Sequence, residues 1–128
     1  MKIVLIDDDD SALAIGKRYV KKFLGAEATT FADAAQAEKY LRTNGADLIV
    51  ADYSMPEMNG IDLINRVRAG GPNQATPIIV VTSSAFESLK GKIMLAGAQD
   101  FLCKPVSPET FKVRVLGRAG TPVEPAVA

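Results

Sequence analysis

The chain has 128 residues, enough for one domain with its own hydrophobic core, and its 15 Lys and Arg balance its 15 Asp and Glu. Because this balance leaves no global basic field, we expect the segment neither to bind nucleic acid nor to associate with an anionic membrane. The absence of histidine excludes Ser-His-Asp and Cys-His catalysis and every zinc site that needs a histidine.

The sequence has no stretch that approaches the roughly 20 apolar residues of a membrane span, and acids rather than a cleavage site follow its apolar start. Cys103 is the single cysteine, so no disulfide can form within the chain. This usage is typical of a reducing cytoplasm, where we expect the protein to reside. We expect Cys103 itself to be a small buried apolar side chain.

Segments that predict strands alternate with helical patterns along the whole chain. The predicted strands are Lys2–Ile6, Ala28–Phe31, Asp47–Ala51, Pro77–Thr82 and Gln99–Cys103. The predicted helices are 11–24, Asp33–Thr43, Ile61–Ala69, Ala85–Ala96 and Ser107–Arg118. Near-continuous apolar runs such as "LIVA" and "IIVV" are typical of strands that are buried on both faces of a parallel sheet.

The first helical pattern is amphipathic. Ser11 is expected to cap it, and its basic side chains lie mostly on the outer face. We expect the inward-facing side chains to be Leu13, Ile15, Val20 and Phe23. Asp9 and Asp10 are expected to be solvated at the start of this helix, where acids are favourable.

Five strand–helix units of this size imply one parallel sheet with helices on both faces, because right-handed crossovers leave few alternatives. We expect one domain over residues 1–119, followed by a flexible tail or the start of a linker at 120–128. In such sheets the functional side chains gather at the carboxyl ends of the strands.

Polar side chains that suit phosphoryl chemistry follow four of the five strands: Asp7 with Asp8, then Asp52, Thr82 and Lys104. Carboxylates and a backbone carbonyl are suitable ligands for Mg²⁺, and a carboxylate can also act as a nucleophile toward phosphorus. A lysine supplies a point charge for phosphoryl oxygens, and a threonine hydroxyl supplies a directional donor.

Four motifs carry a family resemblance: "KIVLIDDDD", "DLIVADYSMPEMNGIDL", "TPIIVVTSS" and "FLCKPVSPE". In this order and spacing they resemble the receiver domain of two-component response regulators, of the chemotaxis-type single-domain kind, over about residues 1–119. The resemblance implies a flavodoxin-like (βα)5 three-layer sandwich. Its five-stranded parallel sheet would have the order 2-1-3-4-5.

The resemblance also assigns roles to individual positions. Asp52 would accept a phosphoryl group from a sensor histidine kinase or a phosphotransfer protein. The resemblance assigns the magnesium ligands as Asp8, Asp52 and the backbone carbonyl of Ser54, with Asp7 acting mostly through water. Lys104 would pair with the phosphoryl group, Thr82 would bond one of its oxygens, and the peptide bond before Pro105 would be cis.

A phosphoryl group would then act as a switch. The resemblance pairs Thr82 with Phe101 as switch residues that bias the surface formed by 85–96, 99–103 and 107–118. Such a protein catalyses only its own phosphorylation and autodephosphorylation, so we expect a phosphoacceptor switch and not an enzyme. The sequence does not identify an output partner. The resemblance is compatible with a dimer that forms on phosphorylation.

Three positions depart from the family pattern or bear on phosphoryl lifetime. Ser83 replaces the small residue that usually follows the threonine, and it could crowd the route to Asp52. Ser54 and Ser84 occupy positions that the family links to dephosphorylation rate. Because neither is an acid or an amide, the sequence predicts no lifetime.

Two other functions compete with this interpretation. Asp7-x-Asp9 after an apolar strand also resembles haloacid dehalogenase-type phosphatases, in which Asp7 would be the nucleophile. That hypothesis leaves the motif around Asp52 unexplained. The second is a pseudo-receiver, an interaction module that never carries phosphate. An EF-hand loop is excluded because "DDDDSALAIGKR" lacks the required glycine and terminal glutamate.

Overall fold

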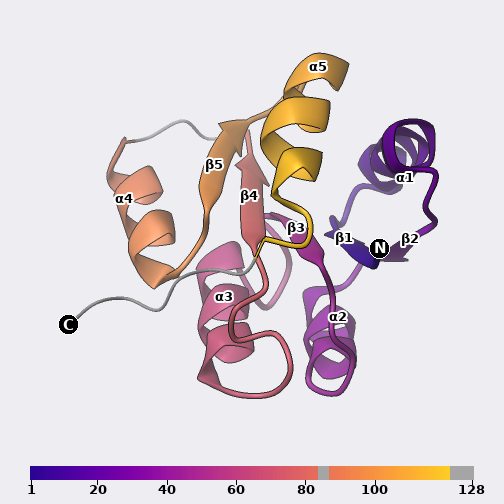
Figure 1. Ribbon diagram of the computed structural model, residues 1–128. Coiled ribbons are helices and arrows are strands. Elements are labelled where there is room, and N and C mark those ends of the chain that lie inside the picture. The colour runs from indigo at the N-terminus through magenta and orange to yellow at the C-terminus, as the bar shows by residue number, and fades with distance from the viewer. Residues whose placement is uncertain (84–86, 122–128) are drawn as a thin grey trace.

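The computed structural model describes residues 1–83 and 87–121 and shows a central sheet between two layers of helices (Figure 1). The strands are β1 (Ile3–Ile6), β2 (Ala28–Phe31), β3 (Leu48–Asp52), β4 (Ile78–Thr82) and β5 (Asp100–Cys103). They pair in parallel in the order β2-β1-β3-β4-β5. The predicted flavodoxin-like sheet and its strand order are confirmed.

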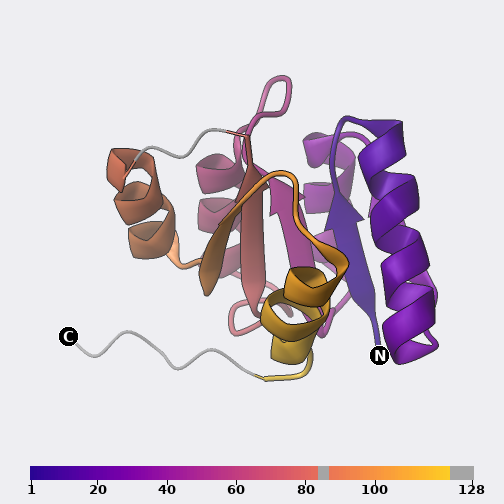
Figure 2. The ribbon, with the colours of Figure 1, turned by 90° about the horizontal axis from the view of Figure 1, so that it is seen from above.

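Helices cover both faces of this sheet (Figure 2). The first four are α1 (Asp10–Leu24), α2 (Ala34–Leu41), α3 (Gly60–Ala69) and α4 (Glu87–Ala96). The predicted start of the fourth helix at Ala85 and most of the tail, 122–128, lie outside the described residues. No helix within 1–83 or 87–121 is both long and apolar enough to cross a membrane.

The last helical segment is less regular than the single helix predicted over 107–118. Ser107 caps it and Pro108 occupies its first turn, but α5 proper covers only Pro108–Thr110. A π-helical turn (η1, Phe111–Val115) and a 3₁₀ turn (η2, Leu116–Arg118) follow. Two β-branched valines and a glycine within this stretch weaken the preference for regular α-helix.

Alternation along the strands divides the core into two clusters, because successive side chains point to opposite faces of the sheet. Val4, Ile49 and Val80 pack on the side that α2, α3 and α4 cover. The other cluster includes β-strand residues Leu5, Val50 and Val81 together with α1 and η1 residues. The carboxyl ends of the strands are therefore held between two packed layers.

Two details of α1 differ from the sequence prediction. Asp9, not Ser11, is the N-cap: its side chain accepts a hydrogen bond of 2.9 Å from the Ser11 amide. Ile15 exposes 47% of its surface, because the buried stripe of α1 consists of Leu13, Gly16 and Val20. Gly16 lets α1 approach the sheet, since a Cβ there would lie 2.9 Å from Leu5 Cδ1.

The prediction that Cys103 is buried was wrong. Its thiol is free and exposed, whereas the preceding residue, Leu102, exposes only 4%. β5 lies at the edge of the sheet and has only β4 beside it. Cys103 is the last residue of this edge strand, so neighbouring elements cover it poorly.

The N-cap assignment predicts different effects for two neighbouring substitutions. Asp9→Ala removes the side chain that caps α1 and should lower the free energy of unfolding by about 1 kcal/mol. Ser11→Ala removes no cap and should change it by less than about 0.5 kcal/mol. Urea unfolding at neutral pH in EDTA measures both, and a larger loss for Ser11→Ala would contradict the assignment.

Candidate functional site

The sheet register brings the predicted site residues to one edge. Ile6 pairs with Ala51, and Asp52 pairs with Val81, so β1, β3 and β4 end close together. Pairing continues one residue beyond the strands, where the Asp7 amide donates to the Phe31 carbonyl (3.1 Å). The Lys104 amide likewise donates to the Thr82 carbonyl (2.8 Å), which places Lys104 at this edge.

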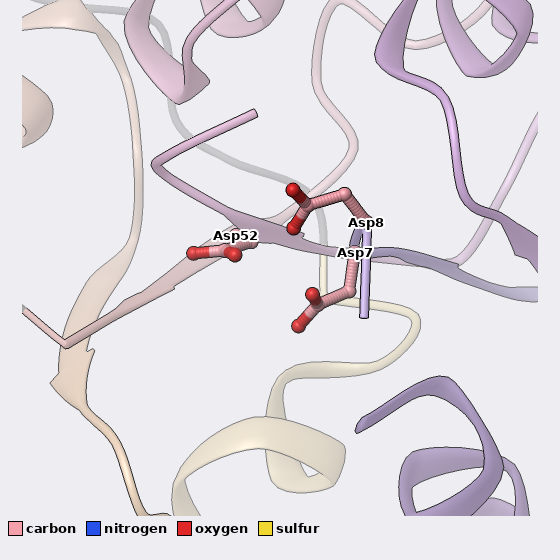
Figure 3. A group of neighbouring side chains, drawn as sticks. All are labelled: Asp7, Asp8 and Asp52. Atoms are coloured by element: carbon pink, nitrogen blue, oxygen red, sulfur yellow. The ribbon is translucent and has the colours of Figure 1, made fainter. Parts of the chain in front are cut away.

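Three carboxyl groups surround a small common space at the ends of β1 and β3 (Figure 3). Asp7, Asp8 and Asp52 each offer an oxygen, and these oxygens lie within 4.8 Å of one another. Asp7 and Asp52 each expose only 9% of their surface, while Asp8 is exposed. Carboxylates this close and this buried repel one another unless a cation compensates them.

Lys104 supplies one cation to this cluster. Its Nζ donates to Asp7 Oδ2 at 2.8 Å and to Asp52 Oδ2 at 3.3 Å. The peptide bond between Lys104 and Pro105 is cis, as the family resemblance implied. The shorter contact with Asp7 was not predicted, because the sequence analysis assigned Lys104 to the phosphoryl group alone.

One lysine does not fully compensate the cluster. Burial raises the pKa of Asp52, and the charge of Asp7 raises it further, against the opposing effect of Lys104 and the Ser54 amide. Burial alone would lower the pKa of Lys104, but hydrogen bonds and charges from Asp7 and Asp52 outweigh it and raise the pKa. The ionised form of Asp52 is therefore less favourable here than that of an aspartate in water.

Backbone amides orient the carboxylates. The Asp9 amide donates to Asp7 Oδ1 at 2.9 Å, and the Ser54 amide donates to Asp52 Oδ1 at 3.4 Å. Asp9 thus stands outside the acidic cluster, as expected, yet its main chain fixes Asp7. The residue identities could not show this contact, because it depends on how the backbone turns into α1.

The loop after Asp52 is held in place by its own motif. Gly60 donates its amide to the Tyr53 carbonyl at 2.9 Å, and a Cβ on Gly60 would lie 3.2 Å from Tyr53 Cα. Asn59 and Asp62 form a capping box at the start of α3. The "MPEMNG" sequence therefore lets the chain return from Tyr53 to Gly60 in a tight loop beside Asp52.

The remaining predicted residues occupy varied environments. Thr82 is fully buried at the end of β4, and Phe101 is half-buried on β5, where it packs against the cluster under α3 and α4. Ser54 and Ser83 are exposed. Ser84 lies outside the described residues.

The family model for the response regulator receiver domain matches residues 3–116. The chain belongs to this family. It is 30% identical over 123 residues to the chemotaxis protein CheY1 of Helicobacter pylori, covering 94% of this chain and 98% of that one. The structure of chemotaxis protein CheY4 of Vibrio cholerae superposes with a TM-score of 0.81 at 29% identity, covering 92% and 97% of the two chains.

Two further similarities bear on the site and on the length of the chain. The receiver domain of sensor histidine kinase PA1611 from Pseudomonas aeruginosa, solved with a magnesium ion in its active-site cleft, matches with a TM-score of 0.78. It is 25% identical and covers 91% of this chain and 97% of that one. The regulatory protein PhoB of Rhizobium meliloti is 32% identical over 114 residues. That match covers 89% of this chain but only 50% of PhoB, so the chain spans half of this relative's length.

As a member of this family, the chain is a response regulator receiver domain of two-component signalling. Receiver domains take phosphoryl groups from histidine kinases or phosphotransfer proteins and bind Mg²⁺ at an acidic pocket. They are signalling switches and are generally not classed as enzymes. The match does not favour the phosphatase hypothesis or the pseudo-receiver hypothesis.

The raised pKa of Asp52 predicts how stability depends on its charge. Above this pKa the ionised carboxylate destabilises the fold, and the cost disappears as the pH falls toward the ordinary value of 3.8. Asp52→Asn should therefore raise the free energy of unfolding at pH 7 in EDTA. The gain should shrink toward zero as the pH is lowered through the pKa of Asp52.

Urea unfolding across this pH range tests the prediction. Asp10→Asn is the matched control, since Asp10 is an exposed acid in the first turn of α1, where its charge is favourable. This control should be slightly less stable than the parent. An Asp52→Asn protein that is less stable at pH 7 would show that Lys104 compensates the cluster completely.

Proposed function

We propose that the chain is a Mg²⁺-dependent phosphoacceptor switch in which Asp52 receives a phosphoryl group from a sensor histidine kinase or a phosphotransfer protein. The observation that carries this proposal is the surroundings of Asp52. Its buried carboxylate lies 3.3 Å from Lys104 Nζ and beside two further carboxylates. A nucleophile, a fixed cation and a set of metal ligands thus meet at one sheet edge.

The donor set fits a magnesium ion. Asp7, Asp8 and Asp52 offer carboxylate oxygens, and Ser54 offers its backbone carbonyl, so every donor is a hard oxygen. The magnesium ion of the PA1611 receiver supports the same use here. When bound, Mg²⁺ supplies positive charge that neutralises phosphoryl oxygens as the group is transferred.

The transfer is a displacement at phosphorus. A carboxylate oxygen of Asp52 forms the new bond to phosphorus, while the bond from phosphorus to the donor's imidazole nitrogen breaks and that nitrogen keeps the electron pair. Lys104 moves from its carboxylate partners to a phosphoryl oxygen, and Thr82 donates its hydroxyl to another. Because the transition state is loose, positioning and electrostatics supply most of the rate enhancement.

The product acts on the neighbouring surface through charge. An aspartyl phosphate adds negative charge and strong acceptor oxygens where Thr82 ends β4. Phe101 lies half-buried on β5, which pairs with β4, so a shift of Thr82 can reach the surface of α4, β5 and α5. Binding of an output partner, or of a second copy, would be sensitive to this shift.

We take residues 1–119 as the receiver unit and 120–128 as a tail or linker. The family match over 3–116 supports this division, although the Gly120 amide still donates to the Asp47 carbonyl at 2.9 Å. The unit would undergo only its own phosphorylation and autodephosphorylation, in the cytoplasm. We assign it no direct contact with nucleic acid or membrane.

Acetyl phosphate tests the phosphoacceptor proposal directly. After incubation with Mg²⁺, intact mass and peptide mapping should show one phosphoryl adduct on Asp52. Omission of Mg²⁺ with EDTA, or the substitution Asp52→Ala, should abolish it. Asp47→Ala serves as the matched control because Asp47 lies at the opposite end of β3, and it should keep the adduct.

Each other outcome points to a different function. An adduct on Asp7 would support the phosphatase hypothesis. No adduct on a folded protein that binds Mg²⁺ would support the pseudo-receiver hypothesis or a route closed by Ser83. The Ser83→Ala protein distinguishes these two, because only a blocked route regains the adduct.

A further inference from the structure

A cavity of about 400 Å³ lies between α1, the sheet and the segment that leads into α5. The helix α1 and the segment around α5 lie on the same side of the sheet (Figure 2). The apolar lining includes Leu13, Ile15, Val50, Val81, Val106 and Phe111. This volume lies within the range of sites that bind small molecules, and such sites combine a mostly apolar wall with a few polar groups.

One end of the cavity is acidic. Asp7, Asp9 and Asp52 contribute to its lining, and Lys104 is the one basic side chain among the described residues there. Asp52 shares a face of the sheet with Val50, so its carboxylate borders the apolar chamber. Three carboxylates against one ammonium leave this end with a net negative charge, which favours a cation.

Aromatic rings form the wall farther along α1. Tyr19 lies about three helical turns beyond the N-cap Asp9. Its ring centroid is 5.3 Å from that of Phe111, the first residue of the π-helical turn, and both rings line the cavity. Wide π turns often occur at functional sites, and here the turn carries an aromatic wall residue.

The cavity is open to solvent beside α1. Ile15 lines it and yet exposes 47% of its surface, so within residues 1–83 and 87–121 no other element covers this side. A molecule can therefore enter without unfolding of α1. Gly16 adds no side chain to the lining.

We propose that this cavity binds a small amphiphilic amine, with an aromatic or alkyl body in the apolar chamber and a protonated amine at Asp7 and Asp52. A neutral or anionic head group would leave the negative charge that remains beyond the Lys104 ion pairs uncompensated. The site goes beyond the phosphoacceptor function, because it needs neither Mg²⁺ nor a phosphoryl donor. A bound amine would occupy the space beside the Asp52 carboxylate and hinder phosphorylation.

The test uses the full chain in EDTA with 4-phenylbutylamine as the probe. Backbone amide spectra recorded during NMR titration should show shifts at Gly16 and Val106, with saturation at millimolar or lower concentration. The alcohol 4-phenylbutanol and the acid 4-phenylbutyrate have the same body, and each should bind at least about tenfold more weakly. Because phosphorylation plays no part in the assay, failure here is distinct from failure of the phosphoacceptor proposal.

Variants of α1 locate the binding. Ala12 lines the cavity, so Ala12→Leu should fill space and weaken amine binding at least about fivefold. Ala14→Leu changes the same residue type at an exposed position of α1 outside the lining and should leave binding unchanged. Should Ala12→Leu fail to fold by its amide spectrum, Val106→Phe fills the cavity from the opposite wall.

Several results would overturn the proposal. They are equal binding of the amine and the alcohol, no saturable binding, and binding that neither cavity-filling variant weakens. A dimer that dissociates on dilution and that Ala12→Leu abolishes would also overturn it, because a segment of a second copy would then be the occupant. Sedimentation of the parent and the variant reports this last outcome.

Discussion

The two ion pairs of Lys104 hold the functional edge of the sheet together. Asp7 follows the first strand and Asp52 ends the third, and each is about nine-tenths buried. Two unit charges at the 4.8 Å limit that encloses these oxygens repel by about 3.5 kcal/mol at an effective dielectric constant of 20. Lys104 offsets this repulsion through its contacts with Asp7 at 2.8 Å and with Asp52 at 3.3 Å. Both contacts join residues that are far apart in the sequence. One lysine beside three carboxylates therefore leaves the charge of this edge only partly balanced.

Because the negative charge of the acidic cluster is only partly balanced, other cations can compete with Lys104 for it. Lys104 retains 29% exposure of its side chain, so it can leave its carboxylate partners when another cation or a phosphoryl group arrives. Asp8 stays exposed beside the two buried carboxylates and completes a set of oxygen ligands. The same carboxylates border the apolar cavity under α1. Mg²⁺, Lys104 and an amine would therefore compete for the same negative charge.

The sequence was sufficient to predict features that depend on the order of apolar and polar residues. Continuous apolar runs predicted the strands, and the strand ends predicted which side chains meet at one edge. Features that depend on exact backbone geometry were not predictable. Three adjacent polar residues could each cap α1, and only the path of the chain selects Asp9. The exposure of Cys103 and the irregular turn after α5 depend on neighbours that the residue pattern does not specify.

A Mg²⁺ titration of the Lys104→Met protein tests the central claim that Lys104 and a metal ion compensate the same carboxylates. Removal of the ammonium that contacts Asp7 and Asp52, two of the proposed ligands, should tighten Mg²⁺ binding at least about fourfold, measured by isothermal titration calorimetry against the parent at equal ionic strength. Lys112→Met, a change of an exposed lysine on the turn after α5, should leave the affinity unchanged. Equal or weaker Mg²⁺ binding by Lys104→Met would contradict the account.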